Sequence, residues 1–230
     1  SPASYYGKEN FGNKTDGKSP LAAVPGLEKY HGTDTFLSEA LTIEAMKALD
    51  DAQQTDKPFF LYMAHYAIHT PIQPDMRFYQ KYLDKGLPPV EAAYATLIEG
   101  MDKSLGDIMD YLDKNNLTEN TILIFMSDNG GLAAHTRAGQ MHVQNYPLNS
   151  GKGSAYEGGI RETMIVRWPG IVAPQTQCDH YLMIEDFFPT ILEMAGVDNY
   201  TTVQQRDGIS FMPLLTGKGK MKDRDIYWHY

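Results

Sequence analysis

Two polar stretches of the sequence contain the residue types that bind ions. The first is SDNGG at 127–131, which follows the apolar run 121–126. Side-chain oxygens of Asp and Asn are the ligands that hard cations such as Ca²⁺ and Mg²⁺ prefer. Ligands of open α/β sheets bind beyond the carboxyl ends of strands, so Asp128 and Asn129 are candidate metal ligands. Asp-Asn-Gly is also a very common turn, and these residues alone favour the turn.

The second stretch is a glycine-rich loop in which Lys152 stands between Gly151 and Gly153. A glycine-rich backbone can approach an anion closely and donate N–H groups, while the ammonium group adds positive charge. A nucleotide P-loop requires Gly six residues before the Lys and Ser or Thr directly after it. Tyr146 and Gly153 hold those places here. A lone Gly-Lys-Gly is usually a surface turn, but both stretches at one sheet edge indicate an enzyme acting on a metal-bound oxyanion ester.

The elements that must position these loops follow an α/β pattern. Short, β-rich apolar runs predict strands at 59–64, 121–126 and 164–168, and residues 225–230 resemble the beginning of another. Apolar residues recurring every three or four positions predict helices at 34–53, 88–115 and 184–195, the first capped by Thr33-Asp34. Helices alternating with strands are typical of α/β layers. Residues 1–33 show no periodicity and are predicted to be irregular chain that packs on the main body.

The composition restricts the class of protein. The chain has 230 residues, of which 42% are hydrophobic and 21% charged, with a formal net charge of −9. These values are typical of a globular protein. The acidic balance disfavours nucleic acid as a partner, because phosphate binding requires a basic surface. No apolar run is long enough to span a membrane, and no signal peptide is recognisable at Ser1. Cys178 is the only cysteine, so no intrachain disulfide forms and the compartment stays open.

His65 and His69 follow the predicted strand at 59–64 with a spacing of four. On a helix this spacing would place both rings on one face, as in zinc sites. The β-rich lead-in and Pro71 argue against a helix. From these residues alone, a structural hydrogen-bonding role is the default expectation for both histidines.

The sequence resembles the sulfatase family of the alkaline-phosphatase-like superfamily. The matching segments are SDNGG at 127–131, NYPLNSGKGSAYEGGIR at 145–161, MIVRWPG at 164–170 and DFFPTILEMAG at 186–196. Weaker matches are AIHTP at 67–71, DGISFMPLL at 207–215 and IYWHY at 226–230. The segments occur in the family's order and cover nearly the whole chain after about Thr33.

This resemblance implies an α/β/α sandwich with a mixed, mostly parallel sheet, followed by a smaller C-terminal subdomain. We expect residues 34–215 to be part of the catalytic domain and residues 216–230 to begin the subdomain. Because the chain starts with a long irregular segment and stops inside the predicted strand at 225–230, we expect a partial domain. The resemblance also implies a periplasmic or secreted location.

The resemblance further implies hydrolysis of sulfate esters, either aryl sulfates or sulfated carbohydrates, with a formylglycine nucleophile and bound Ca²⁺ (or Mg²⁺). By matched position, Asp128 and Asn129 would be metal ligands. His69 and Lys152 would contact the sulfate or assist the leaving group, which reverses the default expectation for His69.

Three further residues lie near these positions. Glu157 and Arg161 match the family's loop after the lysine, where structural roles are expected. His142 lies in the preceding loop, and contact with substrate is a weaker expectation there.

The sequence departs from the family at the nucleophile. Sulfatases make formylglycine from Cys or Ser in a Cys/Ser-x-Pro-x-Arg motif, which does not occur here, and Cys178 is followed by Asp179-His180. The family's upstream pair of Asp ligands is also missing. We expect the nucleophile upstream of Ser1, no sulfatase activity from the isolated chain, and weak Ca²⁺ binding at best.

Two other classes of function stay open. A phosphodiesterase or phosphonate hydrolase of the same superfamily would use additional metal ligands, for which His135 and His142 are available. A non-catalytic glycan-binding module would use exposed aromatic residues, although most aromatics occupy predicted core positions. The natural substrate and the oligomeric state do not follow from the sequence.

Overall fold

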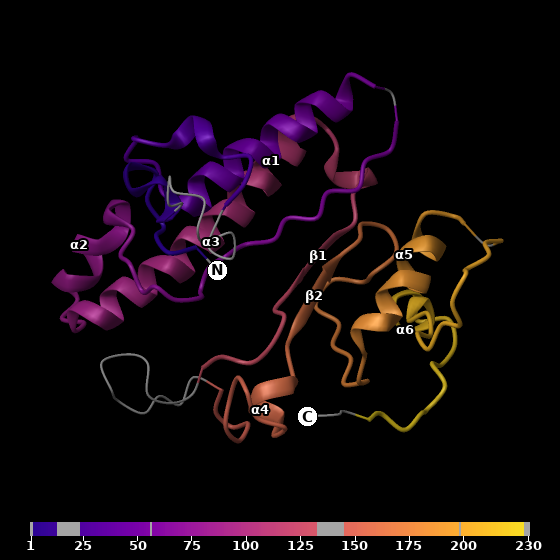
Figure 1. Cartoon of the computed structure of the whole chain (residues 1–230). Coiled ribbons are helices and arrows are strands. Elements are labelled where there is room, and N and C mark those ends of the chain that lie inside the picture. Colours follow the sequence, from indigo (N-terminus) through magenta and orange to yellow (C-terminus); the bar gives the residue numbers. More distant parts are fainter. Residues whose placement is uncertain (1, 13–23, 56, 133–144, 198, 228–230) are drawn as a thin grey trace. The chain divides into compact units, whose positions relative to one another are not determined.

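Figure 1 shows the computed structural model of the chain. The structure describes residues 2–12, 24–55, 57–132, 145–197 and 199–227. These residues divide into two compact units: one contains the described residues up to Leu117, and the other contains those from Thr118 onward. Each unit has its own elements and its own polar contacts.

The first unit is built on two long helices that pack against each other, α1 (Leu37–Gln53) and α3 (Pro89–Lys114) (Figure 1). The helices predicted at 34–53 and 88–115 are therefore confirmed. Pro89 takes the first position of α3, where a missing N–H is tolerated. The cap expected at Thr33-Asp34 is wrong, because Phe36 is the N-cap residue of α1. The Thr33 hydroxyl instead donates to the carbonyl oxygen of Tyr30 at 2.7 Å.

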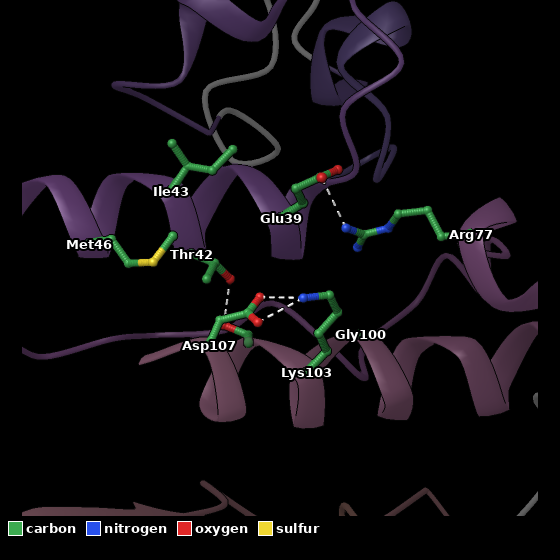
Figure 2. A pocket seen from close by; sticks show the side chains of 9 residues that line it. Glu39, Thr42, Ile43, Met46, Arg77, Gly100, Lys103 and Asp107 are labelled. Atoms are coloured by element: carbon green, nitrogen blue, oxygen red, sulfur yellow. Dashed lines mark hydrogen bonds and ion pairs between the residues drawn. The ribbon is translucent and has the colours of Figure 1, made fainter. Parts of the chain in front are cut away.

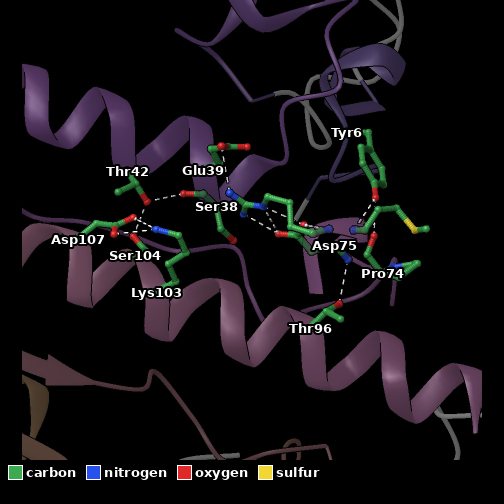
Figure 3. Close-up of polar contacts among 12 residues, drawn as sticks. Tyr6, Ser38, Glu39, Thr42, Pro74, Asp75, Thr96, Lys103, Ser104 and Asp107 are labelled. Carbon is green, nitrogen blue, oxygen red and sulfur yellow. Dashed lines mark hydrogen bonds and ion pairs between the residues drawn. The ribbon is translucent and has the colours of Figure 1, made fainter. Parts of the chain in front are cut away.

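The short helix α2 (Met76–Asp84) packs on α3 and is not predicted by the sequence patterns. Its N-cap is Asp75, a side chain only 1% exposed, which accepts a hydrogen bond from the Arg77 N–H at 3.1 Å. The Arg77 guanidinium pairs with Asp75 at 2.6 Å and with Glu39 of α1 at 3.1 Å. The Asp75 N–H donates to the Thr96 hydroxyl of α3 at 2.9 Å (Figure 3). This network connects all three helices.

The chain before α1 contributes part of the hydrophobic core of this unit. It includes the 3-10 helices η1 (Gly7–Gly12) and η3 (Glu28–Tyr30). The Tyr5 ring stacks on Phe36 with centroids 5.4 Å apart, and the Leu37 N–H donates to the Tyr5 carbonyl at 2.8 Å. The buried side chains of this core are Tyr5, Tyr6, Phe11, Val24, Leu27, Phe36, Leu37, Ala40 and Leu97.

Segment 59–64 corrects one prediction. It is extended but is not a strand, and no backbone hydrogen bond joins it to the described residues. Phe60 is 72% exposed and Tyr62 is 80% exposed, so the segment is not buried either. A strand requires a partner for its N–H and C=O groups, and the described part of the chain supplies none at this segment.

The second unit contains the strands β1 (Leu123–Met126) and β2 (Met164–Arg167). They confirm the strands predicted at 121–126 and 164–168, with shorter bounds. They pair antiparallel, with Ile124 opposite Val166 and Met126 opposite Met164. The expectation of a mostly parallel sheet is therefore not met within the described residues, whose sheet has these two strands alone.

The remaining elements of the second unit are short. They are η4 (Thr118–Asn120), α4 (Glu157–Ile160), η5 (Ile184–Asp186), α5 (Phe187–Met194) and α6 (Met212–Thr216). The helix predicted at 184–195 is confirmed, with a 3-10 first turn. Residues 225–227 form no strand, and the rest of the predicted strand 225–230 lies outside the described residues. Among the described helices, none is both long and apolar enough to cross a membrane.

Asp186 is the polar centre of the second unit. Its side chain is fully buried and accepts hydrogen bonds from the N–H groups of Met183 and Ile209, each at 2.8 Å. The Arg224 guanidinium also pairs with it. One carboxylate thus joins η5 to the segment before α6 and to the chain near Arg224.

The first prediction concerns this carboxylate. Asp186→Ala leaves two N–H groups and one guanidinium without their acceptor, and we expect a loss of about 3 kcal/mol in the free energy of unfolding. Urea denaturation of the protein that carries this sequence measures the change. Asp223→Ala, at an exposed position, is the matched control. Equal stability of the two variants would show that Asp186 does not hold the unit together.

Candidate functional site

The loop after β1 lies directly against α4 and the loop before it. The Gly130 N–H donates to the Gly159 carbonyl at 3.1 Å, and the Lys152 N–H donates to the Gly131 carbonyl at 3.1 Å. A Cβ on Gly130 would lie 1.8 Å from the Gly158 carbonyl oxygen. Only glycine therefore permits this approach of two backbones. The contact brings the two polar stretches of the sequence together.

Asn145 reinforces the same contact through its side-chain amide. Its Oδ1 accepts the Gly131 N–H at 3.1 Å, and its Nδ2 donates to the Gly131 carbonyl at 2.7 Å. Nδ2 also donates to the Ser150 carbonyl at 3.0 Å. Sequence reasoning assigned Asn145 no role, although it begins the segment NYPLNSGKG that contains the lysine.

Asp128 and Asn129 occupy the turn directly after β1, with Asp128 exposed and Asn129 half-buried. A third acidic group, Glu162, follows α4 and is a further residue that sequence reasoning missed. Burial raises the pKa of Glu162, and the nearby negative charge of Asp128 raises it further. Two carboxyl groups that repel each other in this way are an environment that favours a cation.

The Lys152 side chain is exposed and forms no ion pair with the described residues. In contrast, Arg161 pairs with Glu157 at 3.4 Å and lies over the Tyr181 ring, 5.4 Å from its centroid. The Tyr181 hydroxyl donates to Glu157 at 3.1 Å. The charges of Glu157 and Arg161 thus balance each other, whereas Lys152 presents an uncompensated cation to solvent.

His69 belongs to the first unit, whereas Asp128, Asn129 and Lys152 belong to the second. The His69 side chain is exposed, but its backbone carbonyl is held by a buried tyrosine. The hydroxyl of the fully buried Tyr5 donates to the Tyr66 carbonyl at 2.8 Å and to the His69 carbonyl at 2.9 Å. Burial lowers the pKa of the neighbouring His65.

The structure brings three predicted site residues together: Asp128, Asn129 and Lys152. His69 belongs to the other unit, so its place is given only relative to the residues of that unit. His135 and His142 lie outside the described residues, so their predicted roles stay predictions.

The candidate ligands fit a hard cation in type but not in number. Asp128 and Asn129 supply oxygen atoms, but the described residues hold no cluster of three or more His, Cys, Asp or Glu side chains suited to a metal. Ca²⁺ takes roughly six to eight oxygen ligands. These two residues therefore form at most part of a metal site.

A separate pocket lies in the first unit between α1 and α3 (Figure 2). Its volume is about 220 Å³, and it is lined by Glu39, Thr42, Ile43, Met46, Arg77, Gly100, Lys103, Ser104 and Asp107. Arg77 is neutralised by Glu39, and Lys103 by Asp107 at 2.6 Å. No predicted site residue lines this pocket, and its charges are already paired.

Comparison with known proteins identifies the family. A sequence profile of the Sulfatase family matches residues 2–197. The chain belongs to the sulfatase family. It is 33% identical to a sulfatase of Formosa agariphila over 217 residues, which cover 86% of this chain and 37% of the relative. It is 31% identical to the steryl-sulfatase of Homo sapiens over 198 residues, covering 84% of this chain and 32% of that protein. The chain thus spans about a third of the length of these curated relatives.

Solved structures agree with this assignment. The structure of Ps i-CgsB in complex with k-i-k-neocarrahexaose is similar with a TM-score of 0.70 and 31% identity, over 81% of this chain and 41% of that chain. The PsFucS1 sulfatase from Pseudoalteromonas sp. is similar with a TM-score of 0.68 and 25% identity, over 82% of this chain and 36% of that chain. The predicted alkaline-phosphatase-like sulfatase fold is confirmed.

The second prediction tests the glycine contact. Gly130→Ala places a methyl group within the backbone of Gly158, and we expect a loss of about 1–3 kcal/mol in the free energy of unfolding. Chemical denaturation of the whole protein measures it. Gly106→Ala is the matched control, because a Cβ at that position in α3 meets no atom within 4 Å. Gly106→Ala should be no less stable than the unmodified protein, because Ala is favoured over Gly inside a helix. If Gly130→Ala unfolds no more easily than the unmodified protein, the two loops do not depend on this approach.

Proposed function

We propose that the protein carrying this sequence hydrolyses sulfate esters. The observation that supports this most directly is the hydrogen bond from the Lys152 N–H to the Gly131 carbonyl at 3.1 Å. It holds the Lys152 backbone next to the loop that follows the Asp128-Asn129 turn, and the ammonium group is exposed and unpaired among the described residues. Sulfate ester cleavage develops negative charge on the departing oxygen, and cations that are already in place stabilise such charge.

Lys152 and His69 are proposed to bind the sulfate group, by family position. The Lys152 ammonium is a point charge with three donors, suited to a sulfate oxygen. The imidazole of His69 can donate a hydrogen bond to the sulfate or a proton to the leaving group. The fixed backbone at His69 would limit where its ring can reach.

We further propose that Asp128 and Asn129 contribute two ligands to Ca²⁺, with Mg²⁺ as the alternative, and that further ligands come from beyond the described residues. A bound cation of this kind would add positive charge near the sulfate. The carboxylate of Glu162 would add a second negative charge near Asp128 and so strengthen the attraction for the cation. The Ser127 hydroxyl donates to the Asn129 carbonyl at 3.1 Å, which supports the backbone of the turn that carries these ligands.

The nucleophile is proposed to be a formylglycine outside these 230 residues, because no Cys/Ser-x-Pro-x-Arg motif occurs among them. Formylglycine, when present, supplies the oxygen that attacks sulfur. Lys152 and His69 would orient the sulfate for that attack.

We propose sulfated carbohydrates as the substrate class and a periplasmic or secreted location. A solved relative, Ps i-CgsB, has a neocarrahexaose bound, which supports a glycan substrate. No observation among the described residues favours the phosphodiesterase or phosphonate hydrolase alternative.

The third prediction tests Lys152. We expect Lys152→Ala to reduce kcat/KM for a sulfate ester about 10²- to 10³-fold, as for removal of other groups that stabilise developing oxyanions. Release of inorganic sulfate from an aryl sulfate and from a sulfated oligosaccharide is the measurement. Lys222→Ala, at an exposed position of the same unit, should leave the rate unchanged. Faster turnover of the matched phosphate ester by the unmodified protein, or binding of sulfated glycan without hydrolysis, would contradict the proposal.

The fourth prediction concerns the chain of residues 1–230 prepared alone. We expect no turnover of an aryl sulfate, because the chain lacks a nucleophile motif. We also expect only weak Ca²⁺ binding, because two protein ligands leave most of the roughly six to eight coordination positions unfilled. Sulfate release and calorimetric titration with Ca²⁺ measure the two properties. Robust turnover or submicromolar affinity would show that these residues suffice.

A further inference from the structure

We propose that Asn145 is a positioning residue of the same site: its side-chain amide sets the place of Lys152 relative to Asp128 and Asn129. The inference rests on the proposed function, because it names what holds the sulfate-binding lysine in position.

Asn145 acts on both backbone groups of one residue. Its Oδ1 accepts the Gly131 N–H at 3.1 Å and its Nδ2 donates to the Gly131 carbonyl at 2.7 Å. The same Gly131 carbonyl accepts the Lys152 N–H at 3.1 Å. Gly131 lies two residues after Asn129 in the chain. The amide therefore fixes both backbone groups of Gly131, the residue that links the ligand turn to the lysine through a hydrogen bond.

Asn145 also bonds to the lysine loop itself, at a residue that precedes Lys152. Its Nδ2 donates to the Ser150 carbonyl at 3.0 Å. Ser150 has a φ of +66°, a left-handed conformation that is unfavourable for a residue other than glycine. Such a conformation persists only where its surroundings hold it. Because Ser150 stands two residues before Lys152, its conformation affects the course of the backbone that leads to the lysine.

The chemistry of these contacts requires an amide. Gly131 presents a donor and an acceptor, and Ser150 presents a second acceptor, so the side chain must both accept and donate. Asp has no N–H to donate and would place a carboxylate oxygen against two carbonyl oxygens. Ala would leave all three backbone groups without this partner. Asn matches the three groups with one short side chain.

A double-mutant cycle distinguishes positioning of Lys152 from general support of the fold. We expect Asn145→Ala to reduce kcat/KM for sulfate ester hydrolysis about 10- to 100-fold, the range for residues that orient a functional group. In a Lys152→Ala background the same change should cost no more than about twofold, because effects that act through one residue are not additive. The inhibition constant for inorganic sulfate should follow the same pattern in the four proteins.

Controls separate this effect from loss of structure. Asn149→Ala is the matched control, because Asn149 is an exposed residue of the same loop and its side chain has no hydrogen bond to the described residues; its rate should be unchanged. Thermal unfolding of every variant shows whether it folds. Should Asn145→Ala fail to fold, Asn145→Asp takes its place in the cycle, since it keeps the acceptor for the Gly131 N–H.

The outcomes separate the two proposals. An equal loss for Asn145→Ala in both backgrounds would overturn the inference alone and assign Asn145 a purely structural role. An unchanged rate for Lys152→Ala would overturn the proposed role of Lys152, and the inference with it. No release of sulfate by the unmodified protein would overturn the proposed function itself. A loss confined to the Lys152 background would support both.

Discussion

The site depends on a close contact between two backbones. Gly130 lies so close to α4 that a single Cβ would overlap the Gly158 carbonyl oxygen at 1.8 Å. Backbone hydrogen bonds are directional and short, so a contact made of them fixes position more narrowly than packing of flexible side chains. The ligand turn and the lysine loop are thereby held in one arrangement, even though both are loops and β1 and β2 are short.

The charge distribution of the second unit follows from the same arrangement. The net charge of the chain is −9, and several cations are taken up by acidic partners: Arg224 by the buried Asp186, and Arg161 by Glu157. Lys152 is exposed and unpaired among the described residues. An ammonium group whose backbone is fixed and whose charge is not neutralised is available to an anion. The carboxyl groups of Asp128 and Glu162 repel each other and favour a cation instead.

Periodicity and family resemblance predicted the parts of this structure that depend on local sequence. The stripe of apolar residues gave α3 to within one residue at each end, and the β-rich runs gave β1 and β2. What failed depends on partners distant in the sequence. Segment 59–64 has the composition of a buried strand, but a strand also needs a neighbour. Helix α2 is short and polar, and its cap residue Asp75 is held by Thr96 of α3, which lies 21 positions later in the sequence.

The candidate site shows the same division. Asp128, Asn129 and Lys152 were identifiable because their residue types suit ions and because their segments resemble sulfatases. Asn145 and Glu162 were not, since an Asn in a loop is most often a turn residue and a lone Glu is most often solvated. Their roles come from contacts with Gly131 and proximity to Asp128, which no local pattern encodes.

The two units use different physical means to orient their candidate site residues. In the first unit a hydrophobic core holds Tyr5 fully buried, and the Tyr5 hydroxyl then fixes the carbonyl groups of Tyr66 and His69. In the second unit, backbone contacts at glycines and the Asn145 amide fix the backbone of Lys152 close to a solvent-exposed surface. Polar contacts near water are individually weak, so the second arrangement needs several that share one residue. Gly131 is that residue: its N–H donates to Asn145, and its carbonyl accepts from both the Asn145 amide and the Lys152 N–H. Because these bonds share one residue, the loss of any one of them weakens the others. The position of Lys152 therefore depends on residues, such as Asn145, that do not themselves bind the anion.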